Sequence, residues 1–165
     1  MGLVIERATG CSLATYLSQK VWKPLGMKHN ALIAIDSHLS HHSLSFGGLV
    51  TNAIDLAKIG RLYLNRGMWE GKRIVSEEWI TNSMTYDESN HGYHYGLRNI
   101  SSFGESYNNH LHTGFFAYGI HNQNLYINTS LNTICVRLGD KECHNTLPLS
   151  VAFDAICTEW IDRMR

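Results

Sequence analysis

Histidine, a side chain that can act as an acid, a base or a metal ligand, is frequent in this sequence and is concentrated in two short segments. The segment HLSHH spans residues 38–42 and HGYH spans residues 91–94, among ten histidines in all. A zinc site requires three or four ligands that converge on one point. The helical pattern H-E-x-x-H is absent, and both runs lie in polar text typical of a loop. The pattern therefore favours solvated loops, and we expect no metal.

Four cysteines offer thiol chemistry, but their spacing is not that of a thiol motif. They are Cys11, Cys135, Cys143 and Cys157, and no two form a C-x-x-C pair. This spacing indicates neither a zinc ribbon nor a redox motif. None lies within the first turn of an expected helix in a glycine-bearing elbow, where a thiol becomes nucleophilic. We therefore expect buried free thiols.

Helices and strands must position whatever chemistry the chain carries, and capping residues mark several of them. Gly10 and Gly67 stand where left-handed helix ends are expected, and Ser12 and Ser76 are suitable N-caps. Helices are predicted over residues 2–10, 12–24, 54–64 and 149–165, with a short one after Ser76. Either Thr51 or Asn52 caps the third of these helices.

The second half of the chain has an aromatic, glycine-rich composition that is typical of strands. The segments NLYIN and TICVRLG predict two strands joined by a hairpin at residues 129–132. Residues 28–46 are polar and predict a long loop. Helices followed by a hairpin and a closing helix indicate an α/β or α+β layer in which the last helix lies on a sheet.

Charge and composition exclude some classes of partner. Lysine and arginine number 14, equal to aspartate and glutamate, so the net charge is zero. The chain therefore lacks the basic footprint that nucleic acid or an anionic membrane requires. No apolar run approaches the ~20 residues of a membrane span. The first residues show no signal-peptide pattern, so the sequence assigns no compartment.

Three successive stretches resemble the serine β-lactamase-like family. They are GLVIERATGCSLATYLSQKVWKPLGM, GGLVTNAIDLAKIGRLYLNRGMWEGKRIVSEEW and FFAYGIHNQNLYINTSLNTICVRLG. That family includes class C β-lactamases, D-Ala-D-Ala carboxypeptidases, esterases and 6-aminohexanoate-dimer hydrolases, and the third stretch most resembles the last group. The resemblance implies an αβα sandwich with an antiparallel sheet. Residues 1–165 would be the C-terminal part of one such domain, without its N-terminal strands and nucleophile helix.

The nucleophile of that family is a serine whose partner lysine follows three residues later, because positions i and i+3 share one helix face. None of the six lysines here has Ser or Thr three residues before it. The residues found there are Leu17, Lys20, Leu25, Asp55, Trp69 and Leu138. The pair is therefore absent from this chain. The uncapped helix at residues 2–10 agrees with the expectation that Met1 lies partway through a longer protein.

A second family motif, Tyr-x-Asn, has three literal matches. They are Tyr63-Leu64-Asn65, Tyr107-Asn108-Asn109 and Tyr126-Ile127-Asn128. The first lies in a predicted helix and the third in a predicted strand, whereas the family places the motif in a loop well ahead of these stretches. We therefore interpret all three as structural.

The third family motif, Lys-Thr-Gly or a variant such as His-Gly-Gln, lies on the strand that forms one wall of the cleft. His121-Asn122-Gln123 is the better match, because the residues on both sides of it also agree; Asn122 replaces the usual glycine. His112-Thr113-Gly114 is a rival match. An ordinary surface histidine is the alternative interpretation of His121. The resemblance implies His121 as a catalytic residue, with substrate-binding residues Asn122, Gln123 and Tyr95.

The sequence is thus interpreted as the C-terminal portion of a serine hydrolase. In the complete protein, a small-molecule amide or ester would be cleaved through an acyl-enzyme without a cofactor. Alone, this chain is expected to be inactive. The alternative is a non-catalytic binding or partner module derived from the same fold. An apolar face left uncovered where the N-terminal part would pack is expected to favour self-association.

Overall fold

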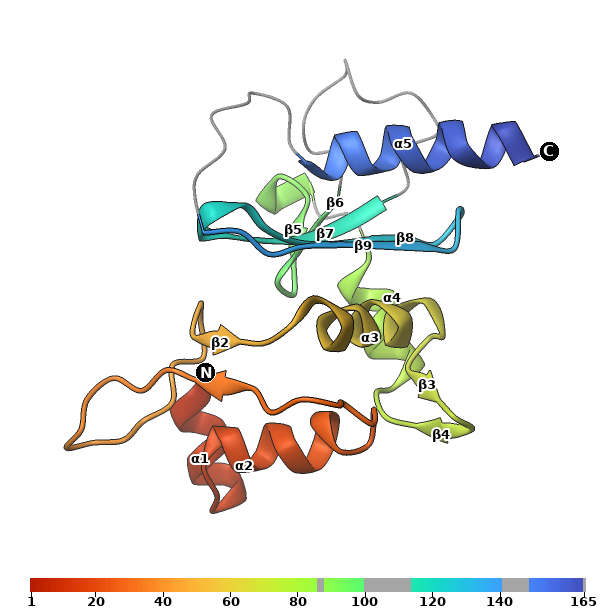
Figure 1. Cartoon of the computed structure of the whole chain (residues 1–165). Coiled ribbons are helices and arrows are strands. Elements are labelled where there is room, and N and C mark those ends of the chain that lie inside the picture. Colours follow the sequence, from red (N-terminus) through yellow and green to blue (C-terminus); the bar gives the residue numbers. More distant parts are fainter. Residues whose placement is uncertain (86–87, 100–113, 141–148, 165) are drawn as a thin grey trace.

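Five antiparallel strands form the centre of the molecule, and one helix packs on each face of this sheet (Figure 1). The computed structural model describes residues 1–85, 88–99, 114–140 and 149–164. Helix α5 (Leu149–Met164) contacts β7 and β8 from one side, and α3 (Ala53–Leu64) contacts β8 and β9 from the other. This layering confirms the predicted αβα architecture.

The sheet has the strand order β5-β6-β7-β8-β9, and every neighbouring pair is antiparallel. The strands are β5 (Tyr93–His94), β6 (Leu97–Asn99), β7 (Gly114–Gly119), β8 (Gln123–Asn128) and β9 (Thr133–Arg137). The β8–β9 hairpin confirms the two predicted strands and their turn. Residues 124–128 of β8 are all buried, because a helix covers each face of this strand.

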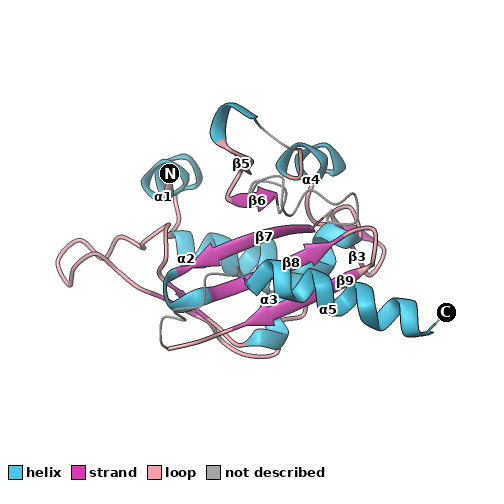
Figure 2. Cartoon of the chain, turned by 90° about the horizontal axis from the view of Figure 1, so that it is seen from above, coloured by secondary structure: helices cyan, strands magenta, loops and turns pink. Residues whose placement is uncertain are grey.

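Packing on the two faces of the sheet is different. On the α5 face, Phe116, Tyr126 and Val151 form a buried cluster, against which Cys135 and Phe153 pack. Figure 2 shows α5 lying across the strands. On the other face, Gly60 lets α3 approach β9 closely, since a Cβ at this position would lie 2.8 Å from Ile134 Cγ2. No helix of the described ranges is long and apolar enough to cross a bilayer.

The first helix ends, and the second helix begins, where their capping residues predict. Helix α1 (Gly2–Thr9) ends at Gly10, whose φ of 69° is left-handed. Helix α2 (Leu13–Leu17) begins after Ser12, which accepts a hydrogen bond from the Thr15 amide. It continues as one turn of π-helix, η1 (Ser18–Trp22), so the helix predicted over residues 12–24 is present in two geometries.

The later helices follow the same rule. Asn52 caps α3 by accepting a hydrogen bond from the Asp55 amide, which decides between the two candidate caps. Ser76 caps α4 (Glu77–Ser83) in the same way through the Trp79 amide. Both caps are polar side chains that satisfy an otherwise free amide in the first turn.

Short antiparallel pairs connect these helices. They are β1 (Leu32–Ile33) with β2 (Leu49–Val50), and β3 (Met68–Trp69) with β4 (Lys72–Arg73). Two-residue strands leave no period-two pattern, so sequence analysis missed them. In particular, β1 lies inside the segment predicted as one long loop. Two 3₁₀ turns, η2 (Glu88–Asn90) and η5 (Ile120–Asn122), lie beside the strands of the central sheet.

Candidate functional site

His121 and Asn122 lie in the tight turn between β7 and β8. Gly119 pairs with Gln123 across this hairpin, so Ile120, His121 and Asn122 form the turn. His121 has a φ of 60° and Asn122 a φ of 59°, both left-handed. Consecutive left-handed residues cannot continue a strand. The expected placement of this motif on a strand is therefore correct only for Gln123, the first residue of β8.

Two side chains hold this turn in its left-handed conformation. Arg137 Nη1 donates hydrogen bonds to the carbonyl oxygens of His121, at 2.9 Å, and Asn122, at 3.0 Å. Tyr118 Oη donates to Asn122 Oδ1 at 2.7 Å. Left-handed backbone costs a non-glycine residue roughly 1–2 kcal/mol, so it persists only where the surroundings support it. Arg137 thereby fixes the backbone that carries the exposed His121 side chain.

Gln123 binds the backbone at the end of β9. Its Nε2 donates to the Gly139 carbonyl, and its Oε1 accepts from the Gly139 amide at 3.0 Å. The Arg137 guanidinium packs against Gly139, because a Cβ built on Gly139 would lie 2.4 Å from Arg137 Nη1. The Gln123 amide therefore holds this end of the sheet together, and its substrate-binding role stays a prediction.

Tyr95 lies in a second turn at the same end of the sheet. Tyr95 (φ 47°) and Gly96 (φ 87°) connect β5 to β6. Because β6 runs antiparallel to β7, the start of β6 lies beside the end of β7. The Tyr95 ring centroid is 4.6 Å from that of Trp79 and 4.3 Å from that of His94. His94 Nδ1 and the Asn82 carbonyl, 2.8 Å apart, connect this turn to α4.

Arg137 and Tyr118 are the residues of this region that sequence analysis missed. Arg137 reaches the turn only because Asn124 pairs with Arg137 in the β8–β9 register. An imidazole on a fixed backbone can donate a hydrogen bond to a developing oxyanion. Acyl transfer also requires an activated nucleophile, and no lysine of this chain has Ser or Thr three residues before it.

The match Tyr126-Ile127-Asn128 is structural, as predicted. Asn128 Nδ2 donates to Tyr126 Oη at 2.8 Å and to Asp154 Oδ1 at 2.7 Å, and Tyr126 Oη also donates to Asp154. All three side chains are fully buried. Burial, together with the hydrogen bond to Asp154, raises the pKa of Tyr126 well above its ordinary value. The motif therefore attaches α5 to β8.

Of the other motif matches, one is described by the structure and two lie wholly or partly outside the described residues. Tyr63-Leu64-Asn65 lies at the end of α3, where Asn65 follows the last helical residue. Tyr107-Asn108-Asn109 lies outside the described residues. So do His112 and Thr113 of the rival match, whereas Gly114 begins β7.

A buried carboxylate, Asp55, organises a polar cluster at the start of α3. It accepts hydrogen bonds from the amides of Lys28, at 2.9 Å, and His29, at 3.0 Å, and from Asn52 Nδ2, at 2.7 Å. Lys58 Nζ lies 3.5 Å from Asp55 Oδ1. Burial alone would raise the pKa of Asp55, but the hydrogen bonds from Asn52, Lys28 and His29 hold it well below its usual range. This cluster joins the loop after η1 to α3.

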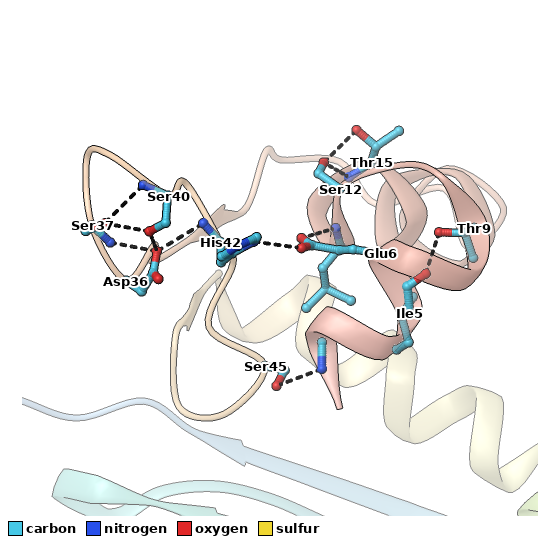
Figure 3. A network of polar contacts seen from close by, with 12 residues as sticks. Ile5, Glu6, Thr9, Ser12, Thr15, Asp36, Ser37, Ser40, His42 and Ser45 are labelled. Atoms are coloured by element: carbon cyan, nitrogen blue, oxygen red, sulfur yellow. Dashed lines mark hydrogen bonds and ion pairs between the residues drawn. The ribbon is translucent and has the colours of Figure 1, made fainter.

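Hydrogen bonds organise the loop that carries the HLSHH run (Figure 3). Asp36 Oδ1 accepts from Ser40 Oγ at 2.7 Å and from the His42 amide at 3.0 Å. The bond from Ser40 lowers the pKa of Asp36. His42 Nδ1 lies 3.1 Å from Glu6 Oε2, which connects the loop to α1. Across the part of the chain that the structure describes, no three His, Cys, Asp or Glu side chains converge as metal ligands would.

Comparison with known proteins places this architecture in one family. The sequence profile of the beta-lactamase family matches residues 1–138. The 6-aminohexanoate-dimer hydrolase of Paenarthrobacter ureafaciens is 27% identical over 140 residues, covering 82% of this chain and 35% of that protein. The chain thus spans about a third of the length of this curated relative.

Solved structures share the fold. A Bacillus anthracis protein assigned as a 6-aminohexanoate-dimer hydrolase superposes with a TM-score of 0.74 at 24% identity, covering 98% of this chain and 40% of its own. A beta-lactamase from Mycobacterium bovis superposes with a TM-score of 0.65 at 16% identity, covering 96% of this chain and 60% of its own. The profile match extends over most of the residues, and the αβα layers agree with it. The chain belongs to the beta-lactamase family.

Proposed function

We propose that this chain is the C-terminal portion of a serine hydrolase that cleaves a small-molecule amide or ester through an acyl-enzyme. The observation that carries the proposal is the beta-lactamase match over residues 1–138. The similarity to the 6-aminohexanoate-dimer hydrolase of Paenarthrobacter ureafaciens favours a short amide as the substrate class. The domain, one unit over residues 1–165, would be completed by strands and a nucleophile helix from a preceding segment.

In this proposal the end of the sheet with the β7–β8 turn borders the substrate. His121 donates a hydrogen bond toward the oxygen that becomes negative in the tetrahedral intermediate, which is the point where a fixed donor lowers the barrier most. Arg137 keeps that donor in place by holding the turn carbonyls. Asn122, Gln123 and Tyr95 border the leaving and acyl groups.

The chain by itself is expected to be inactive, because it carries no Ser-x-x-Lys pair. Loss of the nucleophilic serine lowers turnover about a millionfold in subtilisin. The purified chain should therefore show no saturable hydrolysis of nitrocefin or p-nitrophenyl esters. A serine β-lactamase and a serine esterase, assayed beside it on the same two substrates, show that the assays detect turnover. Saturable turnover with fluorophosphonate labelling of a single serine would contradict the proposal.

A non-catalytic binding module is the second candidate, since the β7–β8 turn is well held while the nucleophile pair is absent. The two proposed functions are distinguished by the motifs that the gene encodes before Met1. The genomic sequence upstream of Met1 supports the hydrolase if it encodes Ser-x-x-Lys and Tyr-x-Asn in frame. If neither motif is encoded there, the module is the correct interpretation.

A further inference from the structure

Two half-buried thiols face each other between the sheet and its covering helix. Cys135 lies on β9 and Cys157 on α5, and their Sγ atoms are 3.8 Å apart. The two residues are 22 positions apart in the chain. Sequence spacing gave no sign of this pair, because it is created by the docking of α5 on the sheet.

We propose that Cys135 and Cys157 are a redox modification site, at which a reversible intramolecular disulfide fastens α5 to β9. A disulfide needs its sulfurs about 2.05 Å apart, so each Sγ has to move by only about 0.9 Å. Rotation about side-chain torsions supplies a movement of this size. Cys135 packs against the cluster that includes Phe116 and Tyr126, so the bond would form at the edge of the α5-side core.

The reaction is a thiol–disulfide exchange with a small disulfide such as oxidised glutathione. The Cys157 thiolate attacks one sulfur of that oxidant, forming a mixed disulfide and releasing one glutathione thiolate. The Cys135 thiolate then attacks Cys157 Sγ and releases the second. In sum, the two protein thiols lose two electrons and two protons, and the oxidant becomes two thiols. Burial raises the pKa of the Cys135 thiol to about 12, so little of it is thiolate at neutral pH; the same bond and the same products result if the two cysteines exchange roles.

The remaining cysteines provide a matched control. Cys11 lies between α1 and α2, where its Sγ contacts Thr9 Oγ1 at 3.4 Å. A chain with Cys11→Ser and Cys143→Ser keeps only the proposed pair. A chain with Cys143→Ser and Cys157→Ser keeps Cys11 and Cys135, which lie on different parts of the fold. Both variants carry two thiols and two substitutions.

The test is incubation of the wild-type chain and both variants with oxidised glutathione, followed by alkylation and mass spectrometry. The pair-only variant should lose two titratable thiols and 2 Da, and dithiothreitol should restore both. Its oxidised form should melt about 5–10 °C above its reduced form, because the bond closes a loop in the unfolded chain. Digestion of the wild-type chain with trypsin and Asp-N should recover the Cys135–Cys157 bond, since trypsin alone leaves Cys143 and Cys157 in one peptide.

Three outcomes would overturn this inference. The first is a pair-only variant that forms only mixed disulfides with glutathione. The second is equally ready intramolecular oxidation of the control variant. The third is an oxidised form that melts at or below the temperature of the reduced form. None of these results depends on the proposed hydrolase function, because no step of the test measures turnover.

Discussion

Asp55 is the residue whose ionisation the fold controls most clearly. Its depressed pKa, below the ordinary value of 3.8, means that the folded chain binds this proton less readily than the unfolded chain. The carboxylate therefore contributes its full stability above about pH 4 and loses it as the pH falls toward the folded-state pKa. Asp55→Asn should lower the free energy of unfolding near neutral pH by about 2 kcal/mol, because it weakens several buried hydrogen bonds.

Chemical denaturation at a series of pH values measures this effect. The stability difference between the wild-type chain and Asp55→Asn should shrink below about pH 4, because the unfolded wild-type chain then binds a proton that the folded chain still excludes. Asp162→Asn, on the exposed side of α5, is the matched control and should leave the free energy of unfolding at each pH nearly unchanged. An Asp55→Asn difference that is independent of pH would contradict the ionisation argument.

His121 is the residue on which the proposed chemistry depends. We expect His121→Ala to lower kcat by about 10² to 10³ with KM little changed, because a single oxyanion donor acts mainly in the transition state. The measurement needs a chain supplied with Ser-x-x-Lys and Tyr-x-Asn. That segment can be the sequence encoded upstream of Met1, where it carries both motifs, or the corresponding part of the Paenarthrobacter ureafaciens hydrolase.

Two further substitutions serve as controls for the placement of this motif. His112→Ala should leave turnover almost unchanged. Asn122→Gly should be neutral or beneficial, because glycine adopts a φ of 59° without the steric cost that asparagine bears, which offsets the lost hydrogen bond from Tyr118. If His112→Ala proves to be the damaging change, the motif has been placed on the wrong histidine.

At the scale of elements, a buried polar network attaches α5 to β8. Asp154 accepts hydrogen bonds from Tyr126 and Asn128, two polar side chains of β8 that are fully buried. Asp154→Ala removes their shared acceptor and should cost about 2–4 kcal/mol of stability. Hydrogen exchange should accelerate in α5 more than in α3, because the latter packs on the opposite face.

A matched surface substitution distinguishes docking from helix stability. Glu159→Ala removes the exposed ion pair with Arg163, one turn apart on α5. Exposed pairs of this kind contribute about 0.3–0.5 kcal/mol, so exchange in α5 should hardly change. Equal effects of the two substitutions would show that Asp154 has no special part in attaching the helix.

At the scale of the whole molecule, three exposed apolar side chains stand on β1, β2 and the start of α3. Leu32 is 69% exposed, Val50 63% and Ile54 66%, and Leu32 pairs with Val50 across the two strands. Surfaces of this kind promote association. We expect the isolated chain to form oligomers whose mass, measured by light scattering after gel filtration, increases with concentration.

The triple variant Leu32→Ser, Val50→Thr, Ile54→Ser should shift that equilibrium toward the monomer. Ile156→Ser removes an equally exposed apolar side chain from α5 and is the control. A sharp monomeric peak for the wild-type chain at high concentration, without binding of a dye specific for apolar surface, would contradict the prediction.

Sequence by itself determined the elements whose signals are local. Gly10 ends α1, and Ser12 and Ser76 cap their helices, because a cap involves only a residue and the amides that follow it. For α3 the sequence left Thr51 and Asn52 as alternatives, and the structure decided for Asn52. The β8–β9 hairpin was equally predictable from its alternating residues and short turn. The family resemblance, confirmed by the profile match, supplied the αβα layers.

Only the tertiary structure decided which distant residues meet. Strand pairing brings Arg137 to the carbonyls of His121 and Asn122, and the docking of α5 brings Cys157 to Cys135. These contacts depend on register and on the packing of a helix against a sheet, neither of which leaves a fixed spacing in the sequence. The left-handed turn is likewise a tertiary outcome, because non-glycine residues adopt it only where other parts of the fold supply the hydrogen bonds that offset its cost.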